Sequence, residues 1–225
     1  MNHIINITLD GPSASGKTTI ARELAEELGL AYVDTGAMYR GIGYEMLSIG
    51  VDTLDADAVA KAVDSINMTI KYIDGVQHVL VNDQDVTSYI RAPEVSMAAS
   101  NVGKVPAVRL KLVELQRNIA RQNSCVLDGR DIGSYVLPRA EYKFYLTASD
   151  EVRAQRRYEE LCAKNVATTL EEVSSDLKKR DLQDSSRSFA PLVIPNGAVY
   201  IDTSSLSLDE VKSLIKEKLY YLKNK

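Results

Sequence analysis

The chain has 225 residues, of which 45% are hydrophobic and 26% charged, and 31 acidic side chains against 27 basic ones give a net charge of −4. These are ordinary values for a globular protein, so they argue against a disordered chain. The acidic balance argues against a nonspecific nucleic-acid-binding protein, and no run of roughly 18 apolar residues predicts a membrane-spanning helix.

The first part of the chain has the pattern of a βαβ unit. Residues 4–9 are β-branched and mostly apolar, as in a buried parallel strand. Residues 17–28 have helical periodicity, Gly29 stands where helices commonly end in glycine, and residues 31–33 form a short second strand. This order predicts an α/β fold with a parallel sheet flanked by helices. The apolar face of the helix is expected to consist of Ile20, Leu24 and Leu28.

The middle of the chain follows a different pattern, which indicates an inserted subdomain. Residues 57–66 predict a helix, and apolar and polar residues alternate over 68–72 as they do in a half-buried strand. Asp74 and Gly75 form a hairpin signal, because both central residues of that turn need positive φ. Residues 76–81 are the expected return strand.

Two prolines mark helix starts before the parallel pattern returns. Pro93 and Pro106 each suit the first turn of a helix. The second of these helices, at about 106–123, is expected to bury Val108, Leu112, Leu115 and Ile119 on one face. The later strands are predicted at residues 125–128, 142–146 and 198–202, with helices at about 149–165 and 169–184 between them.

Two capping boxes appear in the C-terminal part. Thr169 with Glu172 fits the first, and Ser207 with Glu210 fits the second, which opens a terminal helix. The inward face of that helix is expected to consist of Leu208, Val211, Ile215 and Leu222.

Residues 11–18, Gly-Pro-Ser-Ala-Ser-Gly-Lys-Thr, match the phosphate-binding pattern G-x-x-x-x-G-K-[ST]. Glycines let backbone N–H groups curl around phosphate oxygens, Lys17 reaches the β- and γ-phosphates, and the Thr18 hydroxyl can ligate Mg²⁺. A chance match in a glycine turn is the alternative, but the preceding strand and following helix argue against it. The predicted ATP-binding residues are Gly11, Pro12, Ser13, Ala14, Ser15, Gly16, Lys17, Thr18 and Thr19.

Two charged clusters follow strands, at the sheet edge where open α/β sheets bind ligands. After the second strand, Thr35 could cap the next helix and Arg40 could reach an acceptor phosphate; a simple cap and a surface arginine are the alternative. After the strand at 125–128, Asp128 could hold Mg²⁺, and Arg130 and Asp131 would project into the same crevice; a charged turn is the alternative.

A third cluster lies further on, in a very polar segment that also contains Arg153, Arg156 and Arg157. Arg180, Asp184 and Arg187 are spaced i, i+4, i+7, which predicts one helix face and suits a closing phosphate clamp. The alternative is a solvated, ion-paired surface.

The remaining reactive residue types give less specific predictions. Cys125 and Cys162 are far apart and form no paired motif, so we expect reduced thiols in a cytoplasmic protein without a zinc cluster. The start of the chain lacks the pattern of a signal peptide. We interpret His3 and His78 as structural or surface residues.

Together these motifs resemble the bacterial cytidylate kinases, which phosphorylate CMP and dCMP. The phosphate loop is shared by many families, but Asp-Thr-Gly-Ala-Met-Tyr-Arg at 34–40 and Asp-Gly-Arg-Asp-Ile-Gly at 128–133 are far more specific. The likeness covers essentially the whole chain. Its blocks lie at residues 10–18, 34–40, 90–91, 95–96, 105–109, 128–133 and 180–192.

The resemblance implies a single P-loop kinase domain with an acceptor-binding insertion and a helical lid. The core would comprise residues of about 1–35, 106–149 and 191–225, the insertion about 36–105 and the lid about 150–190. ATP, its Mg²⁺ and CMP or dCMP would be the only partners, with neither nucleic acid nor membrane, and we expect a monomer.

The resemblance also assigns roles to single residues. Ser100, Arg109 and Asp131 would recognise the cytosine edge, and Thr35 would lie near the acceptor. Arg40 and Arg130 would bind the acceptor phosphate, Asp184 and Arg187 the sugar, and Arg180 the phosphates in transit. The expected catalytic residues are Lys17, Arg130 and Arg180, and the expected metal-binding residues are Thr18 and Asp128.

Three small departures from the family pattern together leave the preference between CMP and dCMP unpredicted. Thr35 stands where many members have serine, Ser134 stands where threonine is frequent, and Ser-Ala-Ser at 13–15 replaces a commoner glycine-containing version of the loop. Two other functions also remain open. The chain could be a different P-loop kinase for a small molecule, or a nucleotide-dependent switch without transfer activity.

Overall fold

The computed structural model describes residues 4–223, without the side chains of 221–223. The chain forms two compact units. Among the described residues, unit 1 contains Ile4 and residues 31–125, and unit 2 contains residues 5–30 and 126–223.

Unit 2 is built on a parallel sheet in the order β6-β1-β7-β8. β1 pairs with β7 in parallel from Ile7↔Tyr142 onward, and β7 pairs with β8 in parallel from Phe144↔Val199 onward. The predicted parallel sheet is therefore confirmed. Its strands are β1 (Asn6–Asp10), β6 (Cys125–Gly129), β7 (Tyr142–Thr147) and β8 (Val199–Asp202).

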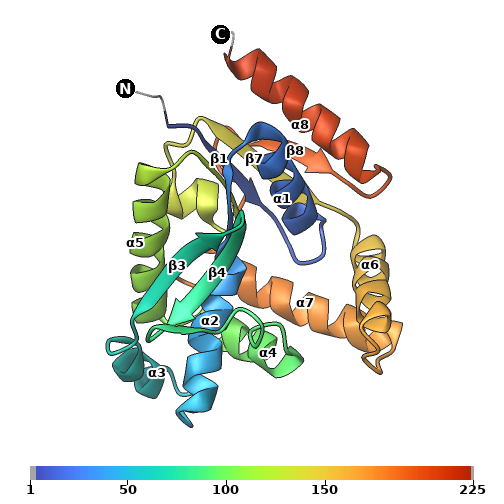
Figure 1. Cartoon of the computed structure of the whole chain (residues 1–225). Helices are drawn as coiled ribbons and strands as arrows, with labels where there is room; N and C mark the ends of the chain where they lie inside the picture. The colour runs from blue at the N-terminus through green and yellow to red at the C-terminus, as the bar shows by residue number, and fades with distance from the viewer. Residues whose placement is uncertain (1–3, 224–225) are drawn as a thin grey trace. The chain divides into compact units, whose positions relative to one another are not determined.

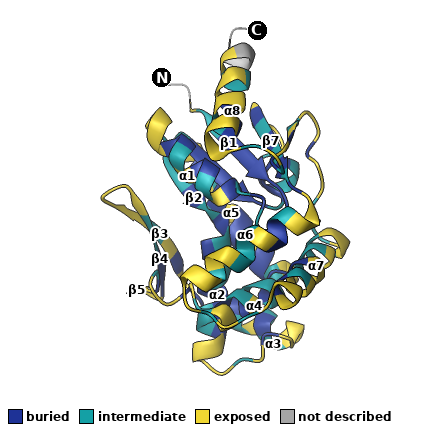
Figure 2. Ribbon diagram, turned by 90° about the vertical axis from the view of Figure 1, so that its right-hand side faces the viewer, coloured by how far each residue is buried: buried dark blue, intermediate teal, exposed yellow. Residues whose placement is uncertain are grey.

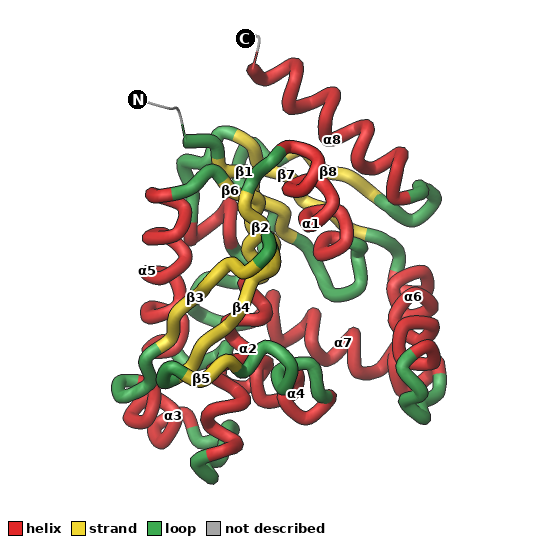
Figure 3. Tube along the Cα trace, in the orientation of Figure 1, coloured by secondary structure: helices red, strands yellow, loops and turns green. Residues whose placement is uncertain are grey.

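Helices cover this sheet, and α1 and α8 pack against each other as well as on the strands (Figure 1). α6 and α7 lie against each other (Figure 3). They pack through Ala154, Val173 and Leu177, and Ala14 of the phosphate loop lies against that cluster. The helices of unit 2 are α1 (Lys17–Leu28), the π-helical turn η1 (Ile132–Val136), α6 (Asp150–Ala163), α7 (Leu170–Ser186) and α8 (Leu208–Lys223).

Helix α1 has the predicted bounds, and Gly29 ends it in the left-handed region, at φ 65°, with its N–H directed to the Ala25 and Glu26 carbonyls. The predicted apolar face is wrong at one position, because Leu28 is 40% exposed. The buried face of α1 includes the small residues Ala21 and Ala25 instead. It consists of Ile20, Ala21, Leu24 and Ala25, together with Lys17.

Both predicted capping boxes are present. The Thr169 hydroxyl accepts from the Glu172 N–H while Glu172 accepts from the Thr169 N–H, and Ser207 and Glu210 repeat the arrangement. On α8, Val211 and Ile215 are buried as expected, but Leu208 is exposed. The side chain of Leu222 lies outside the described residues.

Unit 1 contains β2 (Ala31–Asp34) and a separate antiparallel sheet in the order β3-β4-β5. The predicted hairpin is confirmed: β3 (Met68–Ile73) and β4 (Val76–Val81) flank a turn in which Asp74 has φ 51° and Gly75 φ 77°. The third strand, β5 (Gln84–Asp85), was not predicted, since two residues carry no periodic signal.

The helices of unit 1 pack closely on one another. α2 and α4 approach so tightly that a Cβ on Gly43 would lie 2.8 Å from the Ala99 nitrogen. The prolines Pro93 and Pro106 open α4 and α5 as predicted. These helices are α2 (Thr35–Ser48), α3 (Ala56–Val63), α4 (Pro93–Val102) and α5 (Pro106–Gln122).

The predicted inward face of α5 is partly wrong. Val108 and Leu112 are buried, but Leu115 and Ile119 are only half-buried. The buried face is completed instead by Arg109, Val113, Gln116 and Ala120. Two of these are polar, so apolar periodicity alone could not identify the face.

β1 and β6 are almost wholly buried, as Figure 2 shows for β1, whereas the tip of the β3–β4 hairpin is exposed. Cys125 is buried and Cys162 is exposed, and neither forms a disulfide. His78 lies on the hairpin beside Asp85, as expected for a structural residue; His3 lies outside the described residues. None of the helices among residues 4–223 has both the length and the apolar character needed to cross a membrane.

Candidate active site

The phosphate-binding loop leaves the end of β1 and curls back on itself before α1. Gly11, Ala14 and Gly16 all have positive φ, at 147°, 59° and 87°. A Cβ on Gly11 would also collide with the Leu146 carbonyl of β7. Glycine at this position is therefore a steric requirement, and the loop has the curled backbone that phosphate binding needs.

Lys17 is almost fully buried within this loop. Its Nζ donates to the Pro12 carbonyl at 2.7 Å and to Ser15 Oγ at 3.4 Å. Burial, and then the positive charge of Arg130, lower the pKa of Lys17 to about 7. The negative charge of phosphate oxygens near Nζ would raise the pKa of Lys17 again, so that Lys17 takes up a proton when phosphate binds.

Thr18, in the first turn of α1, and Asp128, near the end of β6, meet at the carboxyl ends of the strands. Thr18 Oγ1 donates to Asp128 Oδ2 at 2.7 Å. Both groups offer the oxygen ligands that Mg²⁺ prefers. Residues 4–223 contain no group of three or more His, Cys, Asp or Glu side chains that could hold a metal.

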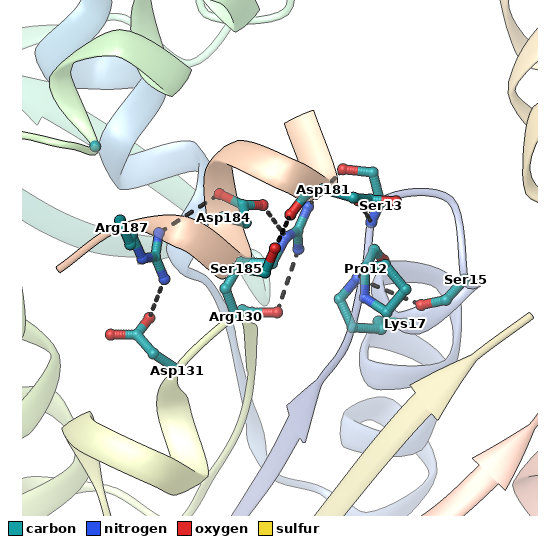
Figure 4. Close-up of polar contacts among 12 residues, drawn as sticks. Pro12, Ser13, Ser15, Lys17, Arg130, Asp131, Asp181, Asp184, Ser185 and Arg187 are labelled. Atoms are coloured by element: carbon teal, nitrogen blue, oxygen red, sulfur yellow. Dashed lines mark hydrogen bonds and ion pairs between the residues drawn. The ribbon is translucent and has the colours of Figure 1, made fainter. Parts of the chain in front are cut away.

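Arg130 connects the phosphate loop with helix α7. Its Nη2 donates to Ser13 Oγ at 2.8 Å and its Nε to Asp184 Oδ2 at 2.9 Å (Figure 4). Burial alone would lower the pKa of Arg130, but the charge of Asp184 and its hydrogen bond raise it above the ordinary value. Arg130 is therefore a permanent cation beside the loop.

Arg187 extends this network to Asp131. Its Nη1 lies 3.5 Å from Asp184 Oδ1 and its Nη2 3.7 Å from Asp131 Oδ1 (Figure 4). The prediction that Arg187 shares a helix face with Arg180 is wrong, because α7 ends at Ser186 and Arg187 is extended, with ψ 141°. Two guanidinium groups and two carboxylates nevertheless alternate here, in the order Arg130, Asp184, Arg187, Asp131.

Arg153 and Asp181 belong to the site, although sequence analysis assigned no role to Asp181 and no specific role to Arg153. Arg153 is buried; its Nη1 contacts Asp181 Oδ2 and donates to the Ser13 carbonyl at 3.2 Å. Asp181 Oδ1 in turn accepts from the Ser13 N–H at 3.3 Å. The pair thus ties α6 and α7 to the loop. No spacing rule links residues 28 positions apart, so the sequence carried no signal for this contact.

Asp10 is a second residue that sequence analysis left without a role. It is buried at the end of β1, and its two oxygens accept the Ile132 and Gly133 N–H groups at 2.7 Å each. Burial raises the pKa of Asp10 to about 7, and these hydrogen bonds oppose the rise. The position of Asp10, an acidic residue at the end of a strand, was the one sequence feature that could have indicated its role.

Unit 1 contains the other predicted acceptor residues. Asp34, not Thr35, caps α2: its Oδ1 accepts from the Ala37 N–H at 2.8 Å, and Thr35 is the first helical residue. The prediction of Thr35 as the cap is therefore wrong, because the longer Asp34 side chain reaches the helix first. Arg40 Nη2 pairs with Asp34 Oδ2 at 2.8 Å.

Arg109 and Ser100 lie on α5 and α4. Arg109 is fully buried, with its guanidinium 5.4 Å from the centre of the Tyr39 ring and Nη1 3.2 Å from the Gly103 carbonyl oxygen. Ser100 is half-buried. An arginine held this firmly presents a fixed set of donors.

The family model described as cytidylate kinase matches residues 7–220. The chain belongs to the cytidylate kinase family. It is 44% identical to the cytidylate kinase of Caldicellulosiruptor bescii over 216 residues, and this match covers 96% of each chain. It is 45% identical over 213 residues to that of Clostridioides difficile, which covers 95% of this chain and 97% of the relative.

A solved structure of an uncharacterized protein from Eubacterium ventriosum matches at a TM-score of 0.51 and 14% identity, covering 98% of this chain and 99% of the other. That likeness concerns the α/β fold alone.

In this cytidylate kinase family member, unit 2 brings the donor loop together with Asp128, Arg130, Asp131, Asp184 and Arg187. Arg180 is also on α7, half-buried. Thr35, Arg40, Ser100 and Arg109 are in unit 1. That these two groups of residues form one acceptor pocket remains a prediction.

Proposed function

We propose that the protein transfers the γ-phosphoryl group of ATP to CMP or dCMP, giving ADP and CDP or dCDP. One observation carries the proposal beyond family membership: Arg130 contacts Ser13 of the phosphate loop and Asp184 of α7 at once. A single cation thus lies between the ATP loop and a predicted sugar-binding residue. Action as a monomer in the cytoplasm is part of the proposal.

At the donor end, the loop N–H groups and Lys17 would bind the phosphates of ATP. Thr18 and Asp128 would hold Mg²⁺, which neutralises phosphate charge when bound with ATP. Thr18 can keep donating its hydroxyl proton to Asp128 while its lone pairs face the ion.

At the acceptor end, Arg40 and Arg130 would bind the phosphate, Thr35 would lie close to it, and Asp184 and Arg187 would bind the sugar. A phosphate oxygen of CMP attacks the γ-phosphorus in line while the bond to the ADP oxygen breaks. Catalysis then consists of positioning and of charge neutralisation, to which Arg180 would contribute.

Recognition of cytosine would rest on Asp131, Arg109 and Ser100. A carboxylate accepts from the exocyclic amine of cytosine, and arginine and serine donate to ring N3 and O2. Uracil has a carbonyl where cytosine has the amine, so Asp131 would face another acceptor. Such a mismatch costs about 1–3 kcal/mol, and we expect UMP to be a poor substrate.

A single-turnover product assay tests the proposal. The protein and Mg·ATP are mixed with CMP, dCMP, UMP, AMP, GMP or no acceptor. CDP and dCDP forming much faster than the other products supports the proposed function, and Arg180→Ala should slow them by about 10³-fold while the fold is kept. Product from another acceptor would disprove the cytosine assignment. ADP release that does not depend on any acceptor would disprove the transfer reaction.

A further inference from the structure

Gln77, on the return strand of the β3–β4 hairpin, binds a residue 43 positions earlier in the chain. Its Oε1 accepts from the Asp34 N–H at 2.8 Å, and its Nε2 donates to the Asp34 carbonyl at 3.1 Å. The amide thus satisfies both backbone groups of Asp34, as a neighbouring strand would. Asp34 is therefore held by its backbone as well as by its side chain.

Asp34 in turn sets the position of Arg40. One of its carboxylate oxygens caps α2 at Ala37, and the other pairs with Arg40 Nη2. The pair lies directly against the backbone of Gly36, where an added Cβ would be 3.0 Å from Arg40 Nη1 and 3.2 Å from Asp34 Oδ1. A shift of the Asp34 backbone would therefore move the Arg40 guanidinium with it.

The Arg40 guanidinium keeps donors for a ligand. Its side chain is 25% exposed, and within residues 4–223 Asp34 is its one ion-pair partner. Nε and Nη1 can therefore donate to an anion without breaking the pair with Asp34. A guanidinium fixed along one edge loses less conformational entropy on binding than a free one.

The hairpin has a second attachment to β2. The Tyr72 hydroxyl donates to the Tyr32 carbonyl at 3.0 Å, and Tyr72 is the residue opposite Gln77 in the β3–β4 register. Burial raises the pKa of Tyr72, which keeps this donor protonated. The hairpin thus holds β2 at Tyr32 and at Asp34, directly before α2 begins.

We propose that Gln77 is a positioning residue: it holds Asp34, and through it Arg40, in place for the phosphate of the acceptor nucleotide. This rests on the proposed function, which gives Arg40 its ligand. It also gives the inserted hairpin a task in acceptor binding. The prediction is specific, because Gln77 acts on the phosphate contact and on no contact to the base.

The test compares the dissociation constants of CMP and of cytidine, measured by titration calorimetry. Cytidine lacks the phosphate, so its affinity does not depend on Arg40. The variants are Gln77→Ala, Arg40→Ala and the double variant. Gln84→Ala is the matched control, since Gln84 lies exposed on β5 of the same sheet. Circular dichroism verifies that each variant is folded.

We expect Gln77→Ala to weaken CMP binding about tenfold, as the loss of one well-placed charge-assisted contact does. Cytidine binding should stay within about twofold of wild type, and Gln84→Ala should change neither constant. In the Arg40→Ala background, the Gln77 substitution should have no further effect, because the residue through which it acts is gone.

Three results would overturn the inference: unchanged CMP binding by Gln77→Ala, equal weakening of CMP and cytidine, or additive losses in the double variant. Failure of the proposed function looks different. Wild-type protein would then bind no CMP. If Arg40→Ala bound CMP as tightly as wild type, the phosphate role of Arg40 and the role of Gln77 would both be wrong.

Discussion

Lys17 lies buried in the phosphate loop with its pKa lowered to about 7 by burial and by Arg130. Phosphate oxygens beside Nζ favour the charged form, so ATP binding above pH 7 takes up a proton. We expect ATP affinity to fall between about pH 7 and 9 and proton uptake to approach one at about pH 8. Calorimetry in buffers of different ionisation enthalpy measures this uptake.

The same lowered pKa of Lys17 also determines how the stability of the ligand-free protein depends on pH. Between about pH 7 and 10.5 the unfolded chain binds a proton at Lys17 that the folded chain does not, so this group makes stability rise with pH.

Lys17→Met is the control for the proton uptake on ATP binding: it should weaken ATP binding and abolish that uptake. Uptake that persists in Lys17→Met would assign the proton to another group.

At the scale of single residues, the sequence predicted the donor side of the site better than its surroundings. Lys17, Thr18 and Asp128 lie where the motif and the strand ends place them, because the loop geometry is local. Arg187 does not follow the helical spacing. A turn stops α7, in which Ala190 has φ 48° and accepts from Arg187 Nε at 2.6 Å. Because no glycine marks this turn in the sequence, the turn could not be predicted from the sequence.

At the scale of elements, one carboxylate fixes the turn that carries two predicted acceptor residues. Asp10 at the end of β1 accepts the first two N–H groups of η1, directly after Arg130 and Asp131. An asparagine has only one acceptor oxygen, and its NH₂ group would face an N–H. We therefore expect Asp10→Asn to lower kcat/KM for CMP about 10–100-fold.

Steady-state kinetics with thermal unfolding check this expectation. Asp202→Asn is the matched control, since Asp202 also ends a parallel strand but is exposed; it should leave both measurements near wild type. Wild-type kinetics in Asp10→Asn would show that the turn holds its shape without this carboxylate.

The capping box of α7 gives a prediction about helix stability. Thr169 and Glu172 satisfy each other's N–H groups, and the helix they open carries Arg180, Asp181 and Asp184. We expect Thr169→Ala to lower the free energy of unfolding by about 1 kcal/mol. Denaturant unfolding measures it. Ser175→Ala, at an exposed position inside the same helix, should not destabilise, and an equal loss there would contradict a capping effect.

Elements with strong local signals were predicted closely, and those that depend on tertiary packing were not. α1 and the β3–β4 hairpin have their predicted bounds within one or two residues, because a glycine stop and a turn with two positive φ values define them. The buried face of α5 includes Arg109 and Gln116, and the Tyr39 ring lies against the Arg109 guanidinium. Hydrophobic periodicity carries no information about such partners.

At the scale of the whole molecule, the order of motifs along the chain predicted the family, and 44% identity over 96% of the chain agrees with it. No motif predicted how distant segments of unit 2 are joined. Arg153 of α6, Asp181 of α7 and Ser13 of the loop meet across more than 130 positions of sequence. Such a contact depends on the complete fold of the unit.

From these contacts we expect Arg153 and Asp181 to stabilise unit 2 as a coupled pair. Arg153 is buried with Asp181, Asp150 and two carbonyls as partners, so Asp181→Ala leaves a buried charge with fewer of them. We expect a loss of about 2 kcal/mol, less than for a fully buried pair because Asp181 is 20% exposed and Asp150 remains. Denaturant unfolding of Asp181→Ala, Arg153→Met and the double variant measures the coupling. The double variant should be more stable than the sum of the single losses predicts, because it removes the unpaired charge together with its partner. Strictly additive losses would mean that the two side chains stabilise the unit independently, without coupling between them.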